Sequence, residues 1–384
     1  MAKLGEVCTI VSGSTPKTSV ASYWDGNIKW ITPAELNEDT FYIMDSVRHI
    51  TEEGKEKTGL SYLPTGTVIL SSRAPIGKTA IAGCEMCCNQ GFKNLICSDA
   101  IYNEYLYFFL KSKTDYLNSL GRGATFKEIS KSIVESIEIP LPEVNQQKEI
   151  AEKFKKLEQL ISLRKQQLAK LDELVKARFV EMFGDCKTNP KNWKTKALEK
   201  IANVGSSKRV FVEELQDSGI PFYRGTEIGA LAEKKAVIPE LFITEEHYKQ
   251  LCETTGKPQK GDLLMPSICP DGRIWIVDTD EPFYFKDGRV LWVHLTSANY
   301  NSVFLLYTLK DRIMTDYASI ASGTTFAELK IFALKKCKIF DVPLELQNQF
   351  ANFVERVDQQ KQTVQQSLEK LELMKKALMQ EYFG

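Results

Sequence analysis

The stretch GRGATFKEIS at residues 121–130 returns as ASGTTFAELK at residues 321–330. The two copies align without a gap, and the correspondence continues through 121–184 and 321–384, where both copies end in Glu-x-Phe-Gly. A long, gapless self-similarity indicates that one structural unit is written twice. The sequence therefore predicts two tandem repeats related by a pseudo-two-fold axis.

A long helix is predicted for the second half of each repeat. Apolar residues fall at every seventh position there, and no proline or glycine occurs from 145 to 182 or from 346 to 382. This spacing is typical of coiled coils, and each helix would be about 57 Å long at roughly 1.5 Å per residue. Two such helices can bury their apolar stripes against each other, most simply in an antiparallel pair. The predicted seam comprises Phe154, Ile161, Leu168, Val175, Phe350, Val357, Val364, Leu371 and Leu378.

A mixed α/β globule is predicted ahead of each long helix, because β-branched runs alternate with turn residues and with an amphipathic helix. The expected fold class is α+β (mixed α/β globules) plus long antiparallel coiled-coil helices. The expected domains are globules at 1–144 and 185–344 and spacer helices at 145–184 and 345–384. The junction after Gly184 maps onto Gly384 and the N-terminus, so the two chain ends should lie near each other.

The repeated phrase itself is predicted to form a structural joint between globule and helix. It provides a glycine at a turn, an aromatic anchor and a hydroxyl that faces a partner or a phosphate. The residues concerned are Gly123, Thr125 and Phe126 in the first copy and Gly323, Thr325 and Phe326 in the second. Beyond them, Glu128 recurs as Glu328 and Gln147 recurs as Gln347.

Motifs for catalysis or metal binding are incomplete. The GKT at 77–79 resembles the end of a phosphate-binding P-loop, but the glycine required five residues earlier is replaced by Ser72. The GCEMCC at 83–88 lacks a second Cys or His pair at metal-ligand spacing, so we expect no metal site. Because the sequence contains no complete set of catalytic residues, we expect a protein that binds other molecules or acts as a scaffold for them.

Composition gives no support to DNA binding on its own. The chain has 50 basic and 50 acidic residues, whereas a stand-alone nucleic-acid binder usually has a basic excess that neutralises phosphates. No apolar run approaches the roughly 20 residues of a membrane helix, and the N-terminus is unlike a signal peptide. The nine cysteines are expected to be reduced thiols. We therefore expect a cytoplasmic protein that does not associate with a membrane.

Several further stretches resemble one known family over essentially the whole chain. They are VSGSTPKTSVASYWDGNIKWITPAEL at 11–36, LPTGTVILSSRAPIGKTAIA at 63–82, NQGFK at 89–93 and the two copies of the repeated phrase. Together with the duplicated layout, they resemble the specificity (S) subunits of type I restriction–modification systems. The second globule departs from the pattern, since SICPDGRIWIV replaces the SSRAPIG stretch.

The resemblance implies a non-catalytic subunit that reads a bipartite, asymmetric DNA site. Each globule would be a target recognition domain for one half-site. The paired helices would act as a ruler and as the docking surface for two methyltransferase (M) subunits, and restriction/motor (R) subunits would join that core. The assembled complex would be an adenine-N6 DNA methyltransferase and ATP-dependent endonuclease. S-adenosylmethionine, ATP and Mg²⁺ are expected in the partner subunits, and no cofactor is expected in this chain.

Base readout is expected from loop residues whose side chains hydrogen-bond to base edges in double-stranded DNA. In the first globule these are Ser14, Thr15, Lys17, Arg73, Lys78, Gln90 and Lys93. In the second they are Ser206, Ser207, Lys208, Arg209, Arg224, Arg273 and Arg289. Two alternatives stay open from the sequence: a helical protein-interaction scaffold without DNA readout, and a DNA methyltransferase or nuclease whose motif is not recognisable.

Overall fold

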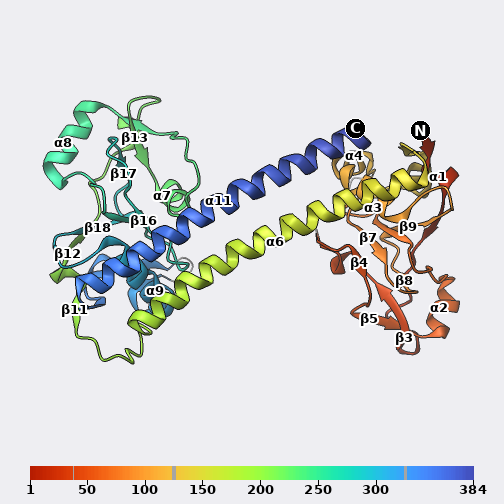
Figure 1. Ribbon diagram of the computed structural model, residues 1–384, viewed down its shortest axis with the longest axis horizontal. Coiled ribbons are helices and arrows are strands. Elements are labelled where there is room, and N and C mark those ends of the chain that lie inside the picture. The colour runs from red at the N-terminus through yellow and green to blue at the C-terminus, as the bar shows by residue number, and fades with distance from the viewer. Residues whose placement is uncertain (38, 123–126, 324–326) are drawn as a thin grey trace. The chain divides into compact units, whose positions relative to one another are not determined.

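The computed structural model describes residues 1–37, 39–122, 127–323 and 327–384. The chain divides into two compact units (Figure 1). Unit 1 consists of Met1–Gln166 together with Val364–Gly384, and unit 2 consists of Gln167–Thr363. Each unit therefore contains one globule, the first part of one long helix and the last part of the other.

The two long helices are α6 (Val144–Phe183) and α11 (Leu344–Phe383), each of 40 residues. In unit 1 the beginning of α6 lies against the end of α11, where Phe154 stacks on Phe383 with ring centroids 5.6 Å apart. In unit 2 the end of α6 lies against the beginning of α11, where Phe179 packs on Phe350 at 5.4 Å. The predicted antiparallel pairing of the helices is thus confirmed in each unit.

The predicted seam residues differ in how deeply they are buried. Phe154, Ile161, Val175, Phe350, Val357 and Val364 are buried, whereas Leu168, Leu371 and Leu378 are half-buried. Near the end of α6 the buried residues also include Phe179 and Phe183, both of which contact Phe304 of the unit 2 globule. The globule thus determines which face of this helix end is buried.

The globule of unit 1 contains two main sheets and the two-stranded pair β1-β10. The larger has the strand order β2-β9-β6-β7-β4 and the smaller the order β5-β3-β8. The strands are β1 (Ala2–Lys3), β2 (Cys8–Ser12), β3 (Trp24–Ile31), β4 (Tyr42–Ile43), β5 (Arg48–Ile50), β6 (Val68–Ser71), β7 (Thr79–Ala82), β8 (Cys87–Cys88), β9 (Phe92–Cys97) and β10 (Glu138–Ile139). The helices are α1 (Leu4–Val7), α2 (Glu52–Thr58), α3 (Asn103–Ser112), α4 (Thr114–Leu120) and α5 (Lys131–Ser136).

The globule of unit 2 repeats this plan. Its larger sheet has the order β12-β18-β15-β16 and a second sheet the order β14-β13-β17. The strands are β11 (Thr195–Ala197), β12 (Ala202–Gly205), β13 (Ile220–Tyr223), β14 (Phe242–Ile243), β15 (Leu263–Pro266), β16 (Trp275–Ile276), β17 (Tyr284–Phe285), β18 (Val290–Leu295), β19 (Ala321–Ser322), β20 (Glu328–Leu329) and β21 (Lys338–Phe340). The helices are α7 (Gly225–Ala232), α8 (Glu245–Thr255), α9 (Ser302–Ile320) and α10 (Ile331–Lys335).

Most strands of these sheets have a counterpart in the other unit, although the larger sheet has five strands in unit 1 and four in unit 2. The antiparallel set β2, β9 and β6 of unit 1 matches β12, β18 and β15 of unit 2. The parallel pair β3 and β8 likewise matches the parallel pair β13 and β17. Mixed α+β globules, two tandem copies and two long helices packed together are therefore the observed fold class, as predicted.

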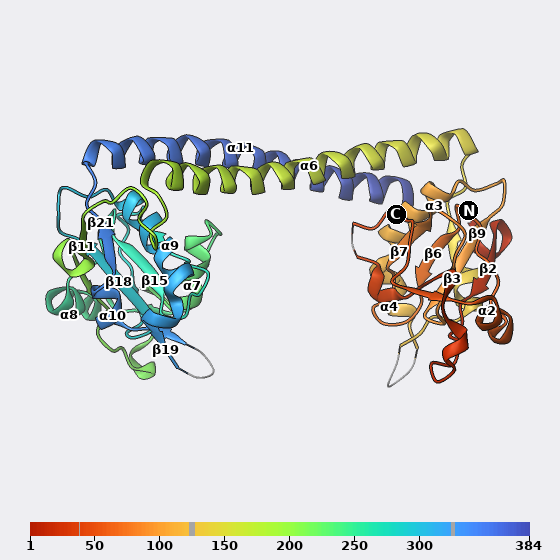
Figure 2. The ribbon, with the colours of Figure 1, turned by 90° about the horizontal axis from the view of Figure 1, so that it is seen from below.

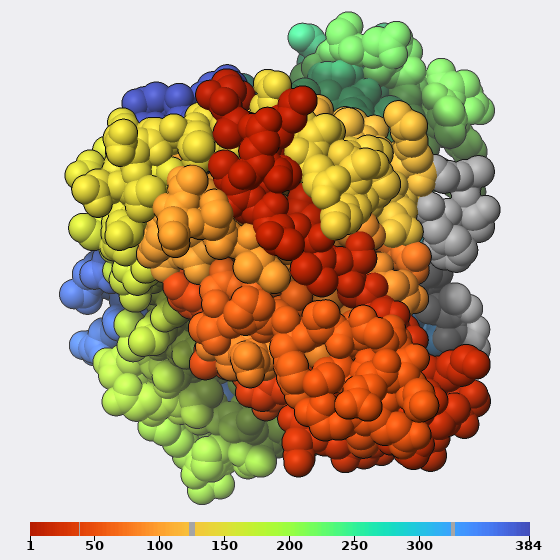
Figure 3. All heavy atoms as spheres, turned by 90° about the vertical axis from the view of Figure 1, so that its right-hand side faces the viewer, coloured from red at the N-terminus to blue at the C-terminus, as the bar shows by residue number. Residues whose placement is uncertain are grey.

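The two ends of the chain lie close together in unit 1, as the repeat predicts (Figure 1). Ala2 and Phe383 belong to the same apolar core, which also contains Tyr105, Phe108 and Phe154. Strand β1 pairs with β10, and on the face of unit 1 shown in Figure 3 the first residues (red) lie beside yellow ones. The N-terminus is thus fastened to the segment that leads into α6.

A repeated glutamine fastens each long helix to its globule. Gln147 is fully buried, accepts a hydrogen bond from the Tyr102 backbone N–H at 2.8 Å and donates to the carbonyls of Ala100 and Pro142 at 3.0 and 2.8 Å. Gln347 repeats the pattern in unit 2: it accepts from the Asn301 N–H and donates to the carbonyls of Asn299 and Val342. Among the described residues, both side chains bond only to backbone groups, which nearly any sequence can supply.

Candidate nucleic-acid interface

Four loops of unit 1 meet where the strands of its two sheets end. Strands β2 and β6 both end beside the beginning of β9, and the parallel strands β3 and β8 end together. Backbone hydrogen bonds join the loops: Ser14 N–H to Cys88 O at 3.0 Å, Ser72 N–H to Gly91 O at 2.7 Å and Ile129 N–H to Ser72 O at 2.9 Å. We call residues 13–17, 72–78, 89–93, 122 and 127–129 the strand-end edge of unit 1.

Unit 2 builds the same edge from the corresponding loops. Ser267 N–H donates to Arg289 O at 2.9 Å, Leu329 N–H to Ser267 O at 2.8 Å and Lys286 N–H to Tyr223 O at 2.9 Å. We call residues 206–209, 224, 267–273, 286–289, 323 and 327–329 the strand-end edge of unit 2. Strand β19, which leads into this edge, lies at the end of the globule away from α11 (Figure 2).

The predicted DNA-binding residues gather on these two edges. Ser14, Thr15, Lys17, Arg73, Lys78, Gln90 and Lys93 lie on the edge of unit 1, and Ser206, Ser207, Lys208, Arg209, Arg224, Arg273 and Arg289 lie on the edge of unit 2. Five of them, Lys17, Gln90, Lys208, Arg209 and Arg289, are exposed. Within the part of the chain that the structure describes, Lys17, Lys208 and Arg209 form no ion pair. These cations are available to phosphates.

Other predicted residues form hydrogen bonds within the edges themselves. The Lys78 ammonium donates to the carbonyls of Pro33 and Leu36 at 3.3 and 2.6 Å. The Ser206 hydroxyl donates to Val290 O at 2.6 Å, and the buried Ser207 hydroxyl donates to Phe285 O at 2.6 Å. The Ser14 carbonyl accepts from the Trp30 indole at 3.0 Å. These contacts fix the loop shapes, while Thr15 Oγ1 is buried and finds no partner among the described residues.

The remaining cations are paired with acids. Arg73 and Lys93 contact Glu128 at 2.8 and 3.1 Å, and Arg289 contacts Glu328. Arg273 lies 2.8 Å from Asp271.

Arg224 is the most fully engaged arginine of the two edges, because it contacts both Glu227 and Glu240. Burial raises the pKa of Glu227, but hydrogen bonds from Arg224 and its neighbours outweigh burial and lower that pKa to about 2. Glu227 is therefore ionised at neutral pH, and its charge offsets that of Arg224.

Arg48 is a cation of this region that the sequence analysis missed. It is exposed on β5, and its guanidinium lies 3.6 Å from the ring centroid of Trp24. The Trp24 indole in turn donates to Lys17 O at 3.2 Å, so the stacked pair supports the loop at 13–17. A cation over a tryptophan face is held in place electrostatically. The contact depends on the register between β3 and β5, which no local sequence signal reveals.

The residues predicted as a structural joint fall largely outside the described residues; this applies to Gly123, Thr125, Phe126, Thr325 and Phe326. Gly323 is described and has a φ of 136°, a backbone conformation that favours glycine. The described flanks of both copies lie on the strand-end edges: Arg122 and Glu128 exchange backbone hydrogen bonds, and β19 pairs with β20.

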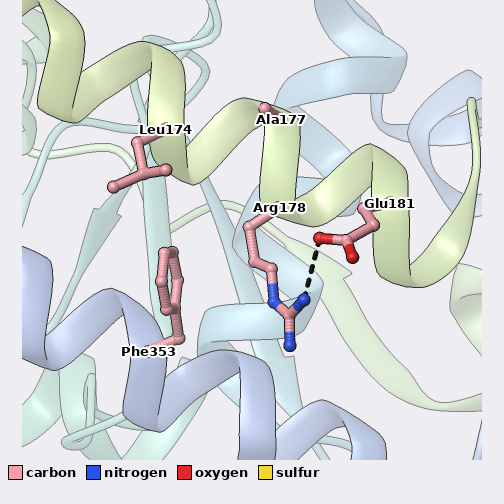
Figure 4. Close-up of a pocket in the computed structure, with 5 residues that line it drawn as sticks. All are labelled: Leu174, Ala177, Arg178, Glu181 and Phe353. Carbon is pink, nitrogen blue, oxygen red and sulfur yellow. Dashed lines mark hydrogen bonds and ion pairs between the residues drawn. The ribbon is translucent and has the colours of Figure 1, made fainter.

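A groove open to solvent lies between α6 and α11 in unit 2 (Figure 4). It is lined by Leu174, Ala177, Arg178, Glu181 and Phe353, and Arg178 pairs with Glu181 at 2.8 Å. Leu174 is 47% exposed, so the helix pair presents an apolar surface as well as a buried seam.

Side chains that could bind a metal ion do not cluster in the described part of the chain. No group of three or more His, Cys, Asp or Glu residues there is placed to hold a metal ion. Two thiols of the GCEMCC stretch are held protonated by their surroundings, since burial raises the pKa of Cys87 to about 11 and that of Cys88 to about 12. No described helix is long and apolar enough to cross a membrane.

Two similar globules with polar loop edges of different composition, joined to a pair of long helices, define a duplicated recognition protein. Comparison with known proteins gives the family. The model of the type I restriction modification DNA specificity domain matches residues 1–173 and 190–373. The chain belongs to the specificity subunits of type I restriction–modification systems.

Individual relatives agree with the family assignment. The MjaIX specificity subunit of Methanocaldococcus jannaschii is 31% identical over 92% of this chain and 85% of the relative. The MjaVIII specificity subunit of the same organism is 25% identical over 75% of this chain and 70% of the relative.

Solved structures share the fold. A type I restriction–modification S subunit from M. genitalium matches with a TM-score of 0.56 at 16% identity, covering 100% of this chain and 95% of that one. A chain from a structure of complex assembly in a type I system matches with a TM-score of 0.64 at 18% identity, covering 100% and 96%. As a specificity subunit, the protein is a non-catalytic component that provides DNA sequence recognition within a complex of several subunits.

Proposed function

We propose that the protein reads a bipartite, asymmetric DNA site, with the strand-end edge of each unit on one half-site. The observation that carries this proposal is that the two edges have the same backbone plan and different side chains. The loop after β6 carries Arg73 where the loop after β15 carries Ile268, because Ser72 and Ser267 occupy the same place in the hydrogen-bond pattern. Equivalent scaffolds with unlike side chains read unlike bases.

In this proposal 1–144 and 185–344 are the two target recognition domains, and 145–184 and 345–384 are the spacer helices. A 40-residue helix is about 60 Å long, equal to roughly 18 base pairs at ~3.4 Å per pair. We expect the helix pair to set a fixed gap between the half-sites and to limit its length, in the way that a rigid dimer fixes half-site spacing.

We further propose that two methyltransferase subunits dock on the helix pair and that restriction subunits join them. The groove at Leu174 and Phe353 supports docking on the helices, as do Leu160 and Leu163, which α6 exposes by 44% and 58%. Exposed apolar surface of this kind marks protein interaction sites. S-adenosylmethionine, ATP and Mg²⁺ would then be held by these partners, and the complex would act on DNA in the cytoplasm.

The neutral net charge fits a reader that works inside such a complex. Partner subunits would supply much of the attraction to phosphates, so the isolated chain should bind DNA weakly and the complex strongly.

Footprinting of the assembled complex on DNA that it methylates tests the proposal. Two protected segments separated by a stretch of fixed length are expected. A single continuous footprint would contradict the two-reader proposal, and no footprint at any sequence would favour a scaffold without DNA readout.

A further inference from the structure

The repeated phrase contributes one acidic side chain to each strand-end edge. Glu128 and Glu328 occupy the same place in the two copies, and their side chains are 32% and 29% exposed. The backbone holds both in place. Glu128 forms β-bridges to Arg73 and Arg122, and Glu328 pairs with Ser322 in the β19–β20 ladder.

The cations that meet these glutamates come from different places in the two units. In unit 1, Arg73 from the loop after β6 and Lys93 from β9 contact Glu128. In unit 2, Arg289 from the loop before β18 and Lys330, which directly follows β20, contact Glu328. The acid is common to both repeats while its basic partners have changed position. Because the glutamate is kept while its basic partners change position, we infer that the glutamate itself has a role at both edges.

The geometry leaves part of each arginine free for a ligand. Arg73 donates through Nε to Glu128 Oε2 at 2.8 Å, while Lys93 occupies Oε1 at 3.1 Å. The Arg73 side chain is 43% exposed and that of Lys93 only 7%. The terminal nitrogens of Arg73 have no protein partner within the described residues. Arg289 donates to Glu328 through Nη1 and is 56% exposed.

The carboxylate of Glu128 is charged under physiological conditions. Burial raises its pKa, but hydrogen bonds from Arg73 and Lys93 outweigh burial and leave the pKa below its ordinary value. A charged carboxylate forms the strong class of hydrogen bond to a guanidinium.

We propose that Glu128 and Glu328 are specificity-determining positioning residues, which orient Arg73 and Arg289 toward DNA bases. This inference rests on the proposed DNA-reading function. An arginine held at one nitrogen by a carboxylate has lost its rotamer freedom before DNA binds, and its remaining N–H groups can pair with the acceptors of guanine. The same carboxylate repels DNA phosphates. An arginine that does not face a matching base therefore contributes little binding free energy.

The test uses the specificity subunit assembled with its partner subunits, in wild-type form and as Glu128→Gln and Glu328→Gln. Dissociation constants are measured for the cognate duplex and for duplexes altered at one base pair in either half-site. We expect each variant to lose discrimination at one half-site by about tenfold and to keep discrimination at the other within about twofold. Glu128→Gln and Glu328→Gln should affect opposite half-sites.

Two controls separate positioning from a general structural effect. Glu135→Gln removes an exposed ion pair of the same unit that lies outside the strand-end edge, Lys131–Glu135 at 3.7 Å, and should change no dissociation constant. In an Arg73→Ala background, Glu128→Gln should cause no further loss of discrimination, because its effect acts through that arginine.

Full discrimination by both Gln variants would overturn the inference, and so would equal weakening on every duplex or additive effects with Arg73→Ala. A wild-type complex that fails to discriminate at either half-site would instead refute the proposed function on which the inference depends.

Discussion

Two repeated polar side chains in each unit differ in what they bind. Within the part of the chain that the structure describes, Gln147 and Gln347 bond only to backbone groups, and their partners correspond in the two units. Glu128 and Glu328 bond to side chains, and those partners come from different positions in the two units. A side chain that bonds to backbone can be kept while its surroundings diverge. A side chain that bonds to side chains meets residues that the repeat does not conserve.

The difference suggests a division of labour within each repeat. The start of the long helix is joined to its globule in the same way in both copies, so the architecture is constant. The strand-end edge keeps its backbone plan and its acid while its cations change, so the chemistry presented there varies. The regions that the copies share therefore carry the fold, and the regions that differ carry the proposed reading of DNA.

The largest expected effect is on stability, from Gln147→Ala. The substitution leaves the Tyr102 N–H and the carbonyls of Ala100 and Pro142 without partners in a buried place. Each orphaned group costs about 1–3 kcal/mol, so the free energy of unfolding should fall by about 3 kcal/mol or more. Chemical denaturation measures the change. Gln166→Ala is the matched control, because that glutamine is exposed on the same helix and its loss should be nearly neutral; equal midpoints for the two variants would break the comparison.

A smaller effect is expected on DNA affinity from Lys17→Ala. This lysine is exposed on the edge of unit 1 and forms no ion pair within the described residues, so it should meet phosphates without orientation by an acid. Affinity of the complex should fall about equally for all duplexes, and the slope of log K against log salt should shrink by about 1. Lys57→Ala, on α2 of the same globule, is the control. A loss confined to one base position would show that Lys17 reads sequence.

The smallest effect is expected on stability from Glu128→Gln. The pKa of Glu128 lies below its ordinary value of 4.5 in the folded state, so its contribution is complete above pH 4.5 and disappears as the pH falls through the lowered pKa. Because the ion pair is partly exposed, the variant should lose less than about 1 kcal/mol at neutral pH. Denaturation midpoints of wild type and variant should converge in acid. A gap that stays constant down to pH 3 would mean that the charge of Glu128 contributes nothing.

Much of the fold was predictable because its signals are repeated in the sequence. The gapless repeat and the seven-residue spacing predicted both long helices, their antiparallel pairing and the proximity of Ala2 to Phe383. The burial of Phe179 and Phe183 was not predicted, because contacts with Phe304 of the globule determine it.

The candidate interface was predictable as a set of loops and much less so as a set of interactions. Loops distant in sequence meet on one edge because β2, β6 and β9 are neighbours in the sheet, so residues selected for their chemistry fell together. The partners of the individual side chains could not be predicted from the sequence. Arg73 and Lys93 share one carboxylate, and Lys78 donates to backbone carbonyls. The stacking of Arg48 on Trp24 depends on strand register, which a single sequence does not specify.

Sequencing of N6-methyladenine in DNA modified by the assembled complex tests the central claim most directly. If the two strand-end edges read DNA independently, every modified site will contain two different short half-sites separated by a constant number of unspecified base pairs. A continuous motif, a palindromic motif or a gap of variable length would contradict the account.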